Sequence, residues 1–158
     1  MPRHTIYPPS CYDDNLVLKV PLLLWVAMFF LVRHFIFLGL TFLPRVGDAM
    51  SYLRDVVEPM FLIADLFAAP VLYIALRRKP GSPKWMRRLW NRGRAVLVAS
   101  ALIYAGLWII NFAIEQRWHL MALKEALVVS LAFDFVFLVI LTTSPLVRDV
   151  FQDFPPAE

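Results

Sequence analysis

Four apolar segments constrain what this chain can fold into. They cover residues 20–43, 58–76, 94–114 and 120–143. Each is close to the roughly 20 residues that an α-helix needs to cross about 30 Å of hydrocarbon. A backbone in lipid must satisfy its own hydrogen bonds, so each segment is expected to be a helix. The sequence therefore predicts an all-α membrane protein, with one domain over residues 1–158 and four transmembrane helices.

Composition supports this prediction. Hydrophobic residues make up 60% of the chain, against roughly 45–50% in a typical soluble domain, and the mean hydropathy is +0.64. The single cysteine, Cys11, excludes an intrachain disulfide and a cysteine-based metal site. The polar residues 1–15 lack the apolar stretch of a signal peptide, so we expect the first apolar segment to remain in the mature protein.

The loop between the second and third segments predicts the orientation of the chain. It holds eight basic residues and no acidic one, namely Arg77, Arg78, Lys79, Lys84, Arg87, Arg88, Arg92 and Arg94. The whole chain has 16 Lys and Arg against 12 Asp and Glu, so this loop accounts for the net charge of +4. Short basic loops stay in the cytoplasm. Both termini are therefore expected on the cytoplasmic side.

The same loop has the pattern of a short amphipathic helix. Ser82 can cap it and Pro83 suits its first position. One face would carry apolar residues and the other basic ones: Trp85, Met86, Leu89 and Trp90 against Lys84, Arg87, Arg88, Asn91 and Arg92. Such a helix lies in the headgroup layer and meets anionic phospholipid. A topology anchor is the favoured interpretation over specific lipid or partner binding, and nucleic-acid binding is not expected from so confined a charge.

Five polar residues fall inside the predicted membrane segments. They are Arg33 and His34 in the first, Asp65 in the second, Asn111 in the third and Asp134 in the fourth. A charge at mid-bilayer costs about 2.5–3.5 kcal/mol on insertion scales, so these side chains should face the bundle interior and find partners.

Small residues indicate which helix faces pack together. Asp134 is four residues from Ser130 and eight from Ala126, and Asp65 is four residues from Ala69. Small residues at this spacing let membrane helices approach closely, which places both aspartates on packing faces. The bulky side chains around Asp134 would then meet lipid, namely Phe133, Phe135 and Phe137.

The simplest hypothesis is that Arg33 pairs with Asp65, Asp134 or both, and so fixes the first helix in the bundle. One arginine cannot neutralise two aspartates, so either one aspartate or His34 must carry an additional proton. A structural pair is favoured, but a proton relay or coupled transporter would use such a cluster as well.

Motifs for chemistry are few. No His, Cys, Asp or Glu set has metal-ligand spacing, and the five glycines form no phosphate-binding loop. No serine lies in a nucleophile motif. We therefore expect no cofactor and no enzymatic activity.

The N-terminal quarter resembles a known family. The residues that carry the resemblance are Tyr12-Asp13-Asp14, Leu18-Lys19-Val20-Pro21, Leu22-Leu23-Leu24-Trp25 and Leu31-Val32-Arg33. They are similar to domain-of-unknown-function family 2919, small inner-membrane proteins of gammaproteobacteria. His34 stands where the family pattern has proline. The resemblance implies a bacterial inner-membrane location and brings no activity.

The leading hypothesis for function is a non-enzymatic accessory or assembly subunit of an envelope complex, in contact with lipid and another membrane protein or further copies of itself. The alternative is a small oligomeric transporter or proton-coupled carrier that uses the intramembrane Arg, His and Asp residues. A dry, packed cluster would favour the first, and a water-accessible cavity the second.

Overall fold

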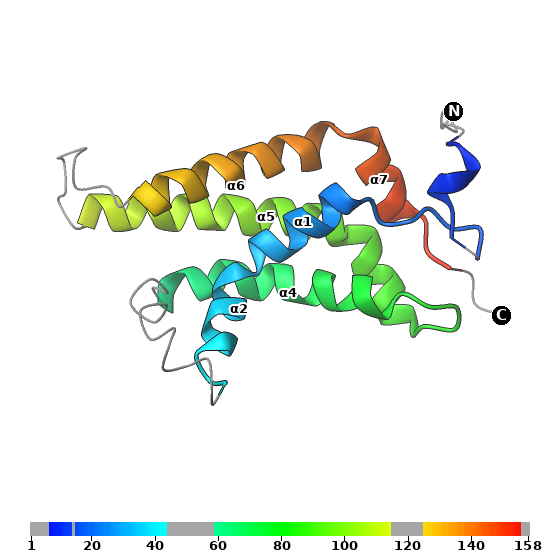
Figure 1. The fold of residues 1–158 in the computed structure, drawn as a ribbon, viewed down its shortest axis with the longest axis horizontal. Helices are drawn as coiled ribbons and strands as arrows, with labels where there is room; N and C mark the ends of the chain where they lie inside the picture. Colours follow the sequence, from blue (N-terminus) through cyan, green and yellow to red (C-terminus); the bar gives the residue numbers. More distant parts are fainter. Residues whose placement is uncertain (1–6, 14, 44–58, 115–124, 156–158) are drawn as a thin grey trace.

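The computed structural model describes residues 7–13, 15–43, 59–114 and 125–155, and for residues 111–114 and 125–127 it describes the backbone alone. Figure 1 shows an assembly of helices packed side by side. Their bounds are η1 (Pro9–Cys11), α1 (Leu22–Leu31), α2 (Arg33–Leu40), η2 (Pro59–Phe61), α4 (Leu62–Arg77), α5 (Lys84–Ile114), α6 (Glu125–Thr143) and α7 (Pro145–Gln152). The all-helical prediction is confirmed for these residues, where the nearest thing to a strand is an isolated bridge between Tyr12 and Leu18.

Between two and four parts of the described chain are long and apolar enough to cross a membrane. Residues Pro59–Arg77 and Lys84–Ile110 qualify as straight helices. The pairs α1 with α2 and α6 with α7 qualify only if each bent pair counts as one span. Many large apolar side chains point outward from these helices, among them Leu66, Leu76, Ile109 and Phe135. An apolar exterior of this extent is what a lipid environment requires and what water would oppose.

The first apolar segment differs from the single helix expected over residues 20–43. The helix is interrupted at Val32, and α1 and α2 meet at an angle of 65°. Neither proline nor glycine stands at the break. The cause lies in a neighbouring helix, as the contacts of Asp65 described below show.

The prediction of a separate interfacial helix after Pro83 is wrong, because α5 continues without a break from Lys84 to Ile114. The first turns of α5 also do not simply rest on a membrane surface. Trp90 is 0% exposed, its ring lies 4.7 Å from that of Phe151 in α7, and its Nε1–H donates to the Val150 carbonyl at 2.9 Å. One face of this basic stretch therefore belongs to the protein core.

The residues after Pro145, expected to form a polar tail, instead form helix α7. Ser144 caps it by accepting from the Val147 amide at 3.4 Å, and α7 turns away from α6 by 68°. The turn brings Val147, Val150 and Phe151 onto the start of α5, where all three are buried. The expectation for the phenylalanines of α6 was also wrong in part: Phe133 and Phe135 are exposed, but Phe137 is buried.

The two ends of the described chain meet at one end of the molecule (Figure 1). The Tyr7 hydroxyl donates to Asp149 Oδ2 at 2.9 Å, and the Leu18 amide donates to Asp153 Oδ2 at 2.8 Å. These contacts join positions 142 and 135 residues apart. We call this arrangement, formed by residues 7–20, Arg78 and residues 149–155, the terminal clasp.

Arg78 holds the terminal clasp together. Its Nη1 donates to the Leu18 carbonyl at 2.8 Å and its Nη2 to the Asp153 carbonyl at 2.6 Å, while its guanidinium lies 5.2 Å from the Trp90 ring. Burial lowers the pKa of the Arg78 guanidinium below its ordinary value, whereas the carboxylates of Asp153 and Asp13 raise it. One arginine thus joins both ends of the chain to the segment between α4 and α5.

Candidate functional site

The candidate site lies at the break between α1 and α2, where the polar side chains of several helices meet. In an unbroken helix the amide of Phe35 would donate to the carbonyl four residues earlier. Here it donates to Asp65 Oδ2 in α4, at 3.0 Å. The Asp65 carboxylate therefore caps the start of α2 from a neighbouring helix, and supplies the acceptor that the interrupted backbone lacks.

His34 completes the coordination of the same carboxylate. Its Nδ1 lies 3.0 Å from Asp65 Oδ1, and both residues are buried. A carboxylate only accepts hydrogen bonds, so an ionised Asp65 fixes the imidazole with a proton on Nδ1. Both oxygens of Asp65 are thus bonded.

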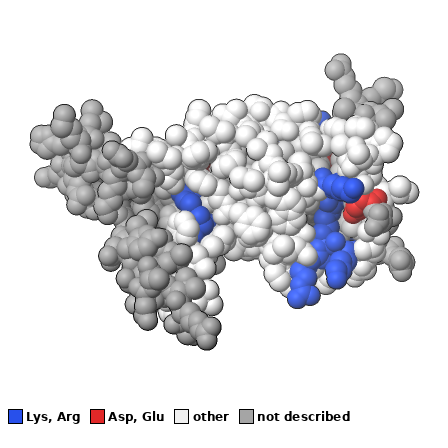
Figure 2. Space-filling model, in the orientation of Figure 1, with Lys and Arg blue, Asp and Glu red and all other residues white. Residues whose placement is uncertain are grey.

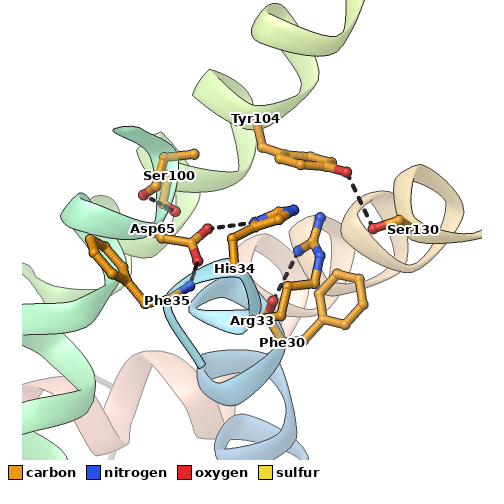
Figure 3. A network of polar contacts seen from close by, with 9 residues as sticks. Phe30, Arg33, His34, Phe35, Asp65, Ser100, Tyr104 and Ser130 are labelled. Atoms are coloured by element: carbon orange, nitrogen blue, oxygen red, sulfur yellow. Dashed lines mark hydrogen bonds and ion pairs between the residues drawn. The ribbon is translucent and has the colours of Figure 1, made fainter. Parts of the chain in front are cut away.

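Aromatic rings enclose the imidazole. The His34 ring stacks on Phe61 at 5.5 Å between centroids and on Tyr104 at 5.7 Å. Phe61 and Tyr104 also contact each other at 5.0 Å. Figure 3 shows Asp65 and His34 facing each other between α4 and α2, with Tyr104 reaching over them from α5. The pair is held in a closely packed aromatic surround.

Two hydroxyl groups on α5 extend the network to further helices. Ser100 Oγ donates to the Ala64 carbonyl of α4 at 2.9 Å, and the Tyr104 hydroxyl donates to Ser130 Oγ of α6 at 3.2 Å. Sequence reasoning gave no role to Ser100, Tyr104 or Phe61. A signal was available for two of them, because Ser100 and Tyr104 are polar residues four apart on one face of an apolar helix.

Arg33 lies in this network but not in the expected ion pair. Its Nη1 donates to the Phe30 carbonyl at 2.9 Å, and its guanidinium lies 4.2 Å from the centroids of both the Phe30 and Tyr104 rings. Among the described residues it forms no ion pair with Asp65 or Asp134. The predicted direct Arg33–aspartate pair is therefore wrong, because His34 and the Phe35 amide occupy Asp65 and aromatic faces receive the cation.

Asp134 is buried on α6, on the packing face that its spacing predicted. Its Oδ1, like Nη2 of Arg33, has no hydrogen-bond partner among the described protein atoms. Asn111, the fifth predicted polar residue, belongs to the last turns of α5, and its side chain lies outside the described residues.

The basic residues predicted to meet lipid divide into two groups. Arg87 and Arg94 are turned to the protein: Arg87 Nη2 donates to the Pro155 carbonyl at 2.8 Å, and Arg94 Nε donates to the Leu141 carbonyl at 2.7 Å. A second, exposed group comprises Arg77, Lys79, Lys84, Trp85, Arg88 and Arg92. Figure 2 shows basic side chains gathered at this end of the molecule and a largely uncharged middle. Of the predicted interface residues, Trp85, Arg88 and Arg92 are therefore free to face outward, whereas Trp90 and Arg87 are structural.

The comparisons with known proteins agree with the N-terminal motif. A family model described as "Protein of unknown function (DUF2919)" matches residues 7–153, nearly the whole chain. Neither a curated protein nor a solved structure matches it. The match includes the interrupted first helix, the buried Asp65 and the terminal clasp. The chain therefore belongs to the family of unknown function DUF2919.

Proposed function

We propose that this protein is a non-enzymatic accessory or assembly subunit of an envelope complex in the bacterial inner membrane. In this proposal it crosses the bilayer four times, the bent pairs α1–α2 and α6–α7 each supply one span, and both termini are cytoplasmic. The basic residues at the terminal clasp and the positive-inside rule support that orientation. The segments between the described helices are 15 residues (44–58) and 10 residues (115–124) long, so partner contacts would be made mainly within the membrane.

One observation carries the accessory role. The buried carboxylate of Asp65 is fully bonded, by His34 and the Phe35 amide, and the histidine is stacked between two aromatic rings. Groups arranged to bind a substrate keep bonding capacity available, whereas these groups use theirs to stabilise a bend between helices. The centre of the bundle thus has the character of a structural lock.

The test is purification of the tagged chain from its native membrane in a mild detergent, followed by mass spectrometry of the proteins that accompany it. A partner at fixed stoichiometry that is lost in Asp65→Asn, but retained in a surface variant such as Lys79→Gln, supports the proposal. A homogeneous assembly of this chain alone would contradict it.

A second candidate function is a small oligomeric transporter or proton-coupled carrier. The observation in its favour is the interruption of the first span at Val32, beside buried His34 and Asp65, since discontinuous helices often form transport sites. Proton flux into liposomes that is lost in Asp65→Asn and Asp134→Asn would support the carrier. Equal flux in protein-containing and empty liposomes would dismiss it.

We further propose anionic phospholipid as a partner of the exposed basic face of α5. Lys84, Arg88 and Arg92 are spaced by four residues and stand beside the exposed Trp85, a combination suited to phosphate headgroups. The variant Arg88→Gln with Arg92→Gln is expected to retain less co-purified anionic lipid than the wild type. Lys19→Gln removes an exposed charge from the same end and is the matched control.

A further inference from the structure

The Arg33 guanidinium lies against one face of α6. Its two aromatic contacts both lead to that helix: the Phe30 ring lies 5.8 Å from Phe133 and 5.1 Å from Phe137, and the Tyr104 hydroxyl bonds Ser130. Positions 130, 133 and 137 of α6 therefore surround the guanidinium.

Asp134 belongs to this same face of α6. It follows Ser130 by four residues and precedes Phe137 by three, the two spacings that place side chains on one side of a helix. It is 2% exposed, so its carboxylate points into the bundle. Arg33 and Asp65 are the charged groups whose fields reach it.

The unfilled bonding capacity at this interface is complementary. Arg33 Nη2 is a buried donor and Asp134 Oδ1 a buried acceptor, and neither has a partner among the described protein atoms. A buried charged group without hydrogen bonds is costly, and proteins meet that cost with internal water where the lining is polar. Water can accept from the guanidinium and donate to the carboxylate in one step.

We propose that Arg33 and Asp134 hold a bound-water site between α2 and α6, inside the apolar bundle. The site is separate from the Asp65–His34 pair, whose carboxylate is already fully bonded, and it does not depend on the accessory role. Tyr104 forms part of its lining, since its ring contacts the guanidinium and its hydroxyl bonds Ser130.

Radiolytic hydroxyl-radical footprinting tests the site, because an X-ray pulse generates radicals from bound water and mass spectrometry then locates the oxidised side chains. The full chain in lipid nanodiscs is irradiated, and each rate is divided by the intrinsic reactivity of its residue type. Tyr104 is expected to oxidise several-fold faster than Phe151, although the two are 2% and 1% exposed. Phe151 is a stringent control because it lies near the terminal clasp, at the charged end of the molecule.

Two variants identify the source of the radicals. Arg33→Met with Asp134→Leu removes both polar groups at similar volume, and the Tyr104 rate should fall to that of Phe151. Asp134→Asn keeps an acceptor for water and should keep a fast Tyr104 rate. Equal rates for Tyr104 and Phe151 in the wild type would overturn the proposal without any variant, and so would a fast rate that survives in the double variant.

Discussion

Asp65 illustrates how one carboxylate can stabilise an interrupted helix in an apolar bundle. A helix break leaves backbone amides without acceptors, and in lipid no water replaces them. Asp65 accepts from one such amide, that of Phe35, and from His34 at the same time. Asp134 is equally buried but bonds no described protein atom through Oδ1. Two aspartates that look alike in the sequence thus stand in different environments.

The two aspartates should therefore respond differently to the same substitution. Asp65→Asn exchanges one accepting oxygen for an amide that can only donate, so His34 or Phe35 loses its partner. We expect a loss of about 1–3 kcal/mol of unfolding free energy, the usual cost of an unsatisfied buried group. Asp134→Asn should cost clearly less, because no direct protein hydrogen bond is lost at Oδ1. Thermal unfolding of both variants in one detergent measures the contrast, and equal losses would contradict it.

Arg33 should show a selective genetic rescue. Arg33→Ala removes the cation that faces the Asp134 carboxylate and is expected to lower the yield of folded protein in the membrane. Asp134→Asn should restore that yield by removing the uncompensated charge. Asp65→Asn should not, because it also breaks the cap of α2. Fluorescence-detected size-exclusion chromatography reports the yield, and rescue by Asp65→Asn alone would refute this assignment.

At the scale of elements, α7 is what turns the basic start of α5 into core. The Trp90 and Phe151 rings pack together, and α5 can approach α7 closely because Gly93 has no side chain. A Cβ placed on Gly93 would lie 2.6 Å from Phe151 Cε1 and 3.2 Å from Val71 Cγ1. The contact between α4, α5 and α7 thus depends on one glycine.

Gly93→Ala is expected to destabilise the protein. The added methyl group forces Phe151 out of its contact, and overpacking of this kind costs about 1–3 kcal/mol. Gly106→Ala is the matched control on the same helix, since a Cβ there meets nothing within 4 Å. That variant should be neutral or gain up to about 1 kcal/mol from helix propensity. Unfolding temperatures of the two variants decide the matter, and a Gly93→Ala protein as stable as Gly106→Ala would refute the close contact.

For the whole molecule, the terminal clasp sets a constraint on topology. Hydrogen bonds join the N-terminal segment, Arg78 and the C-terminal segment, so these parts must lie on the same side of any membrane. The structure fixes this relation, and the orientation relative to the cytoplasm is the part supplied by the positive-inside rule.

Cysteine labelling checks both statements. In a Cys11→Ser background, Lys79→Cys and Gln152→Cys place thiols at exposed positions near the terminal clasp, and Phe42→Cys places one at the exposed end of the first bent pair. A membrane-impermeant maleimide added to intact spheroplasts should label only Phe42→Cys. The other two should react once the membrane is opened. Opposite labelling of Lys79→Cys and Gln152→Cys would contradict the clasp, whereas inversion of the whole pattern would contradict only the proposed orientation.

The sequence by itself determined the helical class, the apolar segments and the faces on which Asp65 and Asp134 lie. These are matters of composition and of spacing along one chain, so local patterns suffice for them. The resemblance carried by the first 33 residues was likewise enough to indicate the family, and the family match over residues 7–153 confirms it.

Only the tertiary structure decided which polar groups are partners. The helix break at Val32 has no proline or glycine to mark it, because its stabilising acceptor comes from α4, about 30 residues away. The sequence pointed to Arg33 as the partner of the aspartates by charge, but a histidine and a backbone amide reach Asp65 first. Trp90 likewise appeared interfacial until α7 supplied a surface to cover it. Pairing and burial depend on which helices come together in space, and the periodicity of a single helix carries no record of its neighbours.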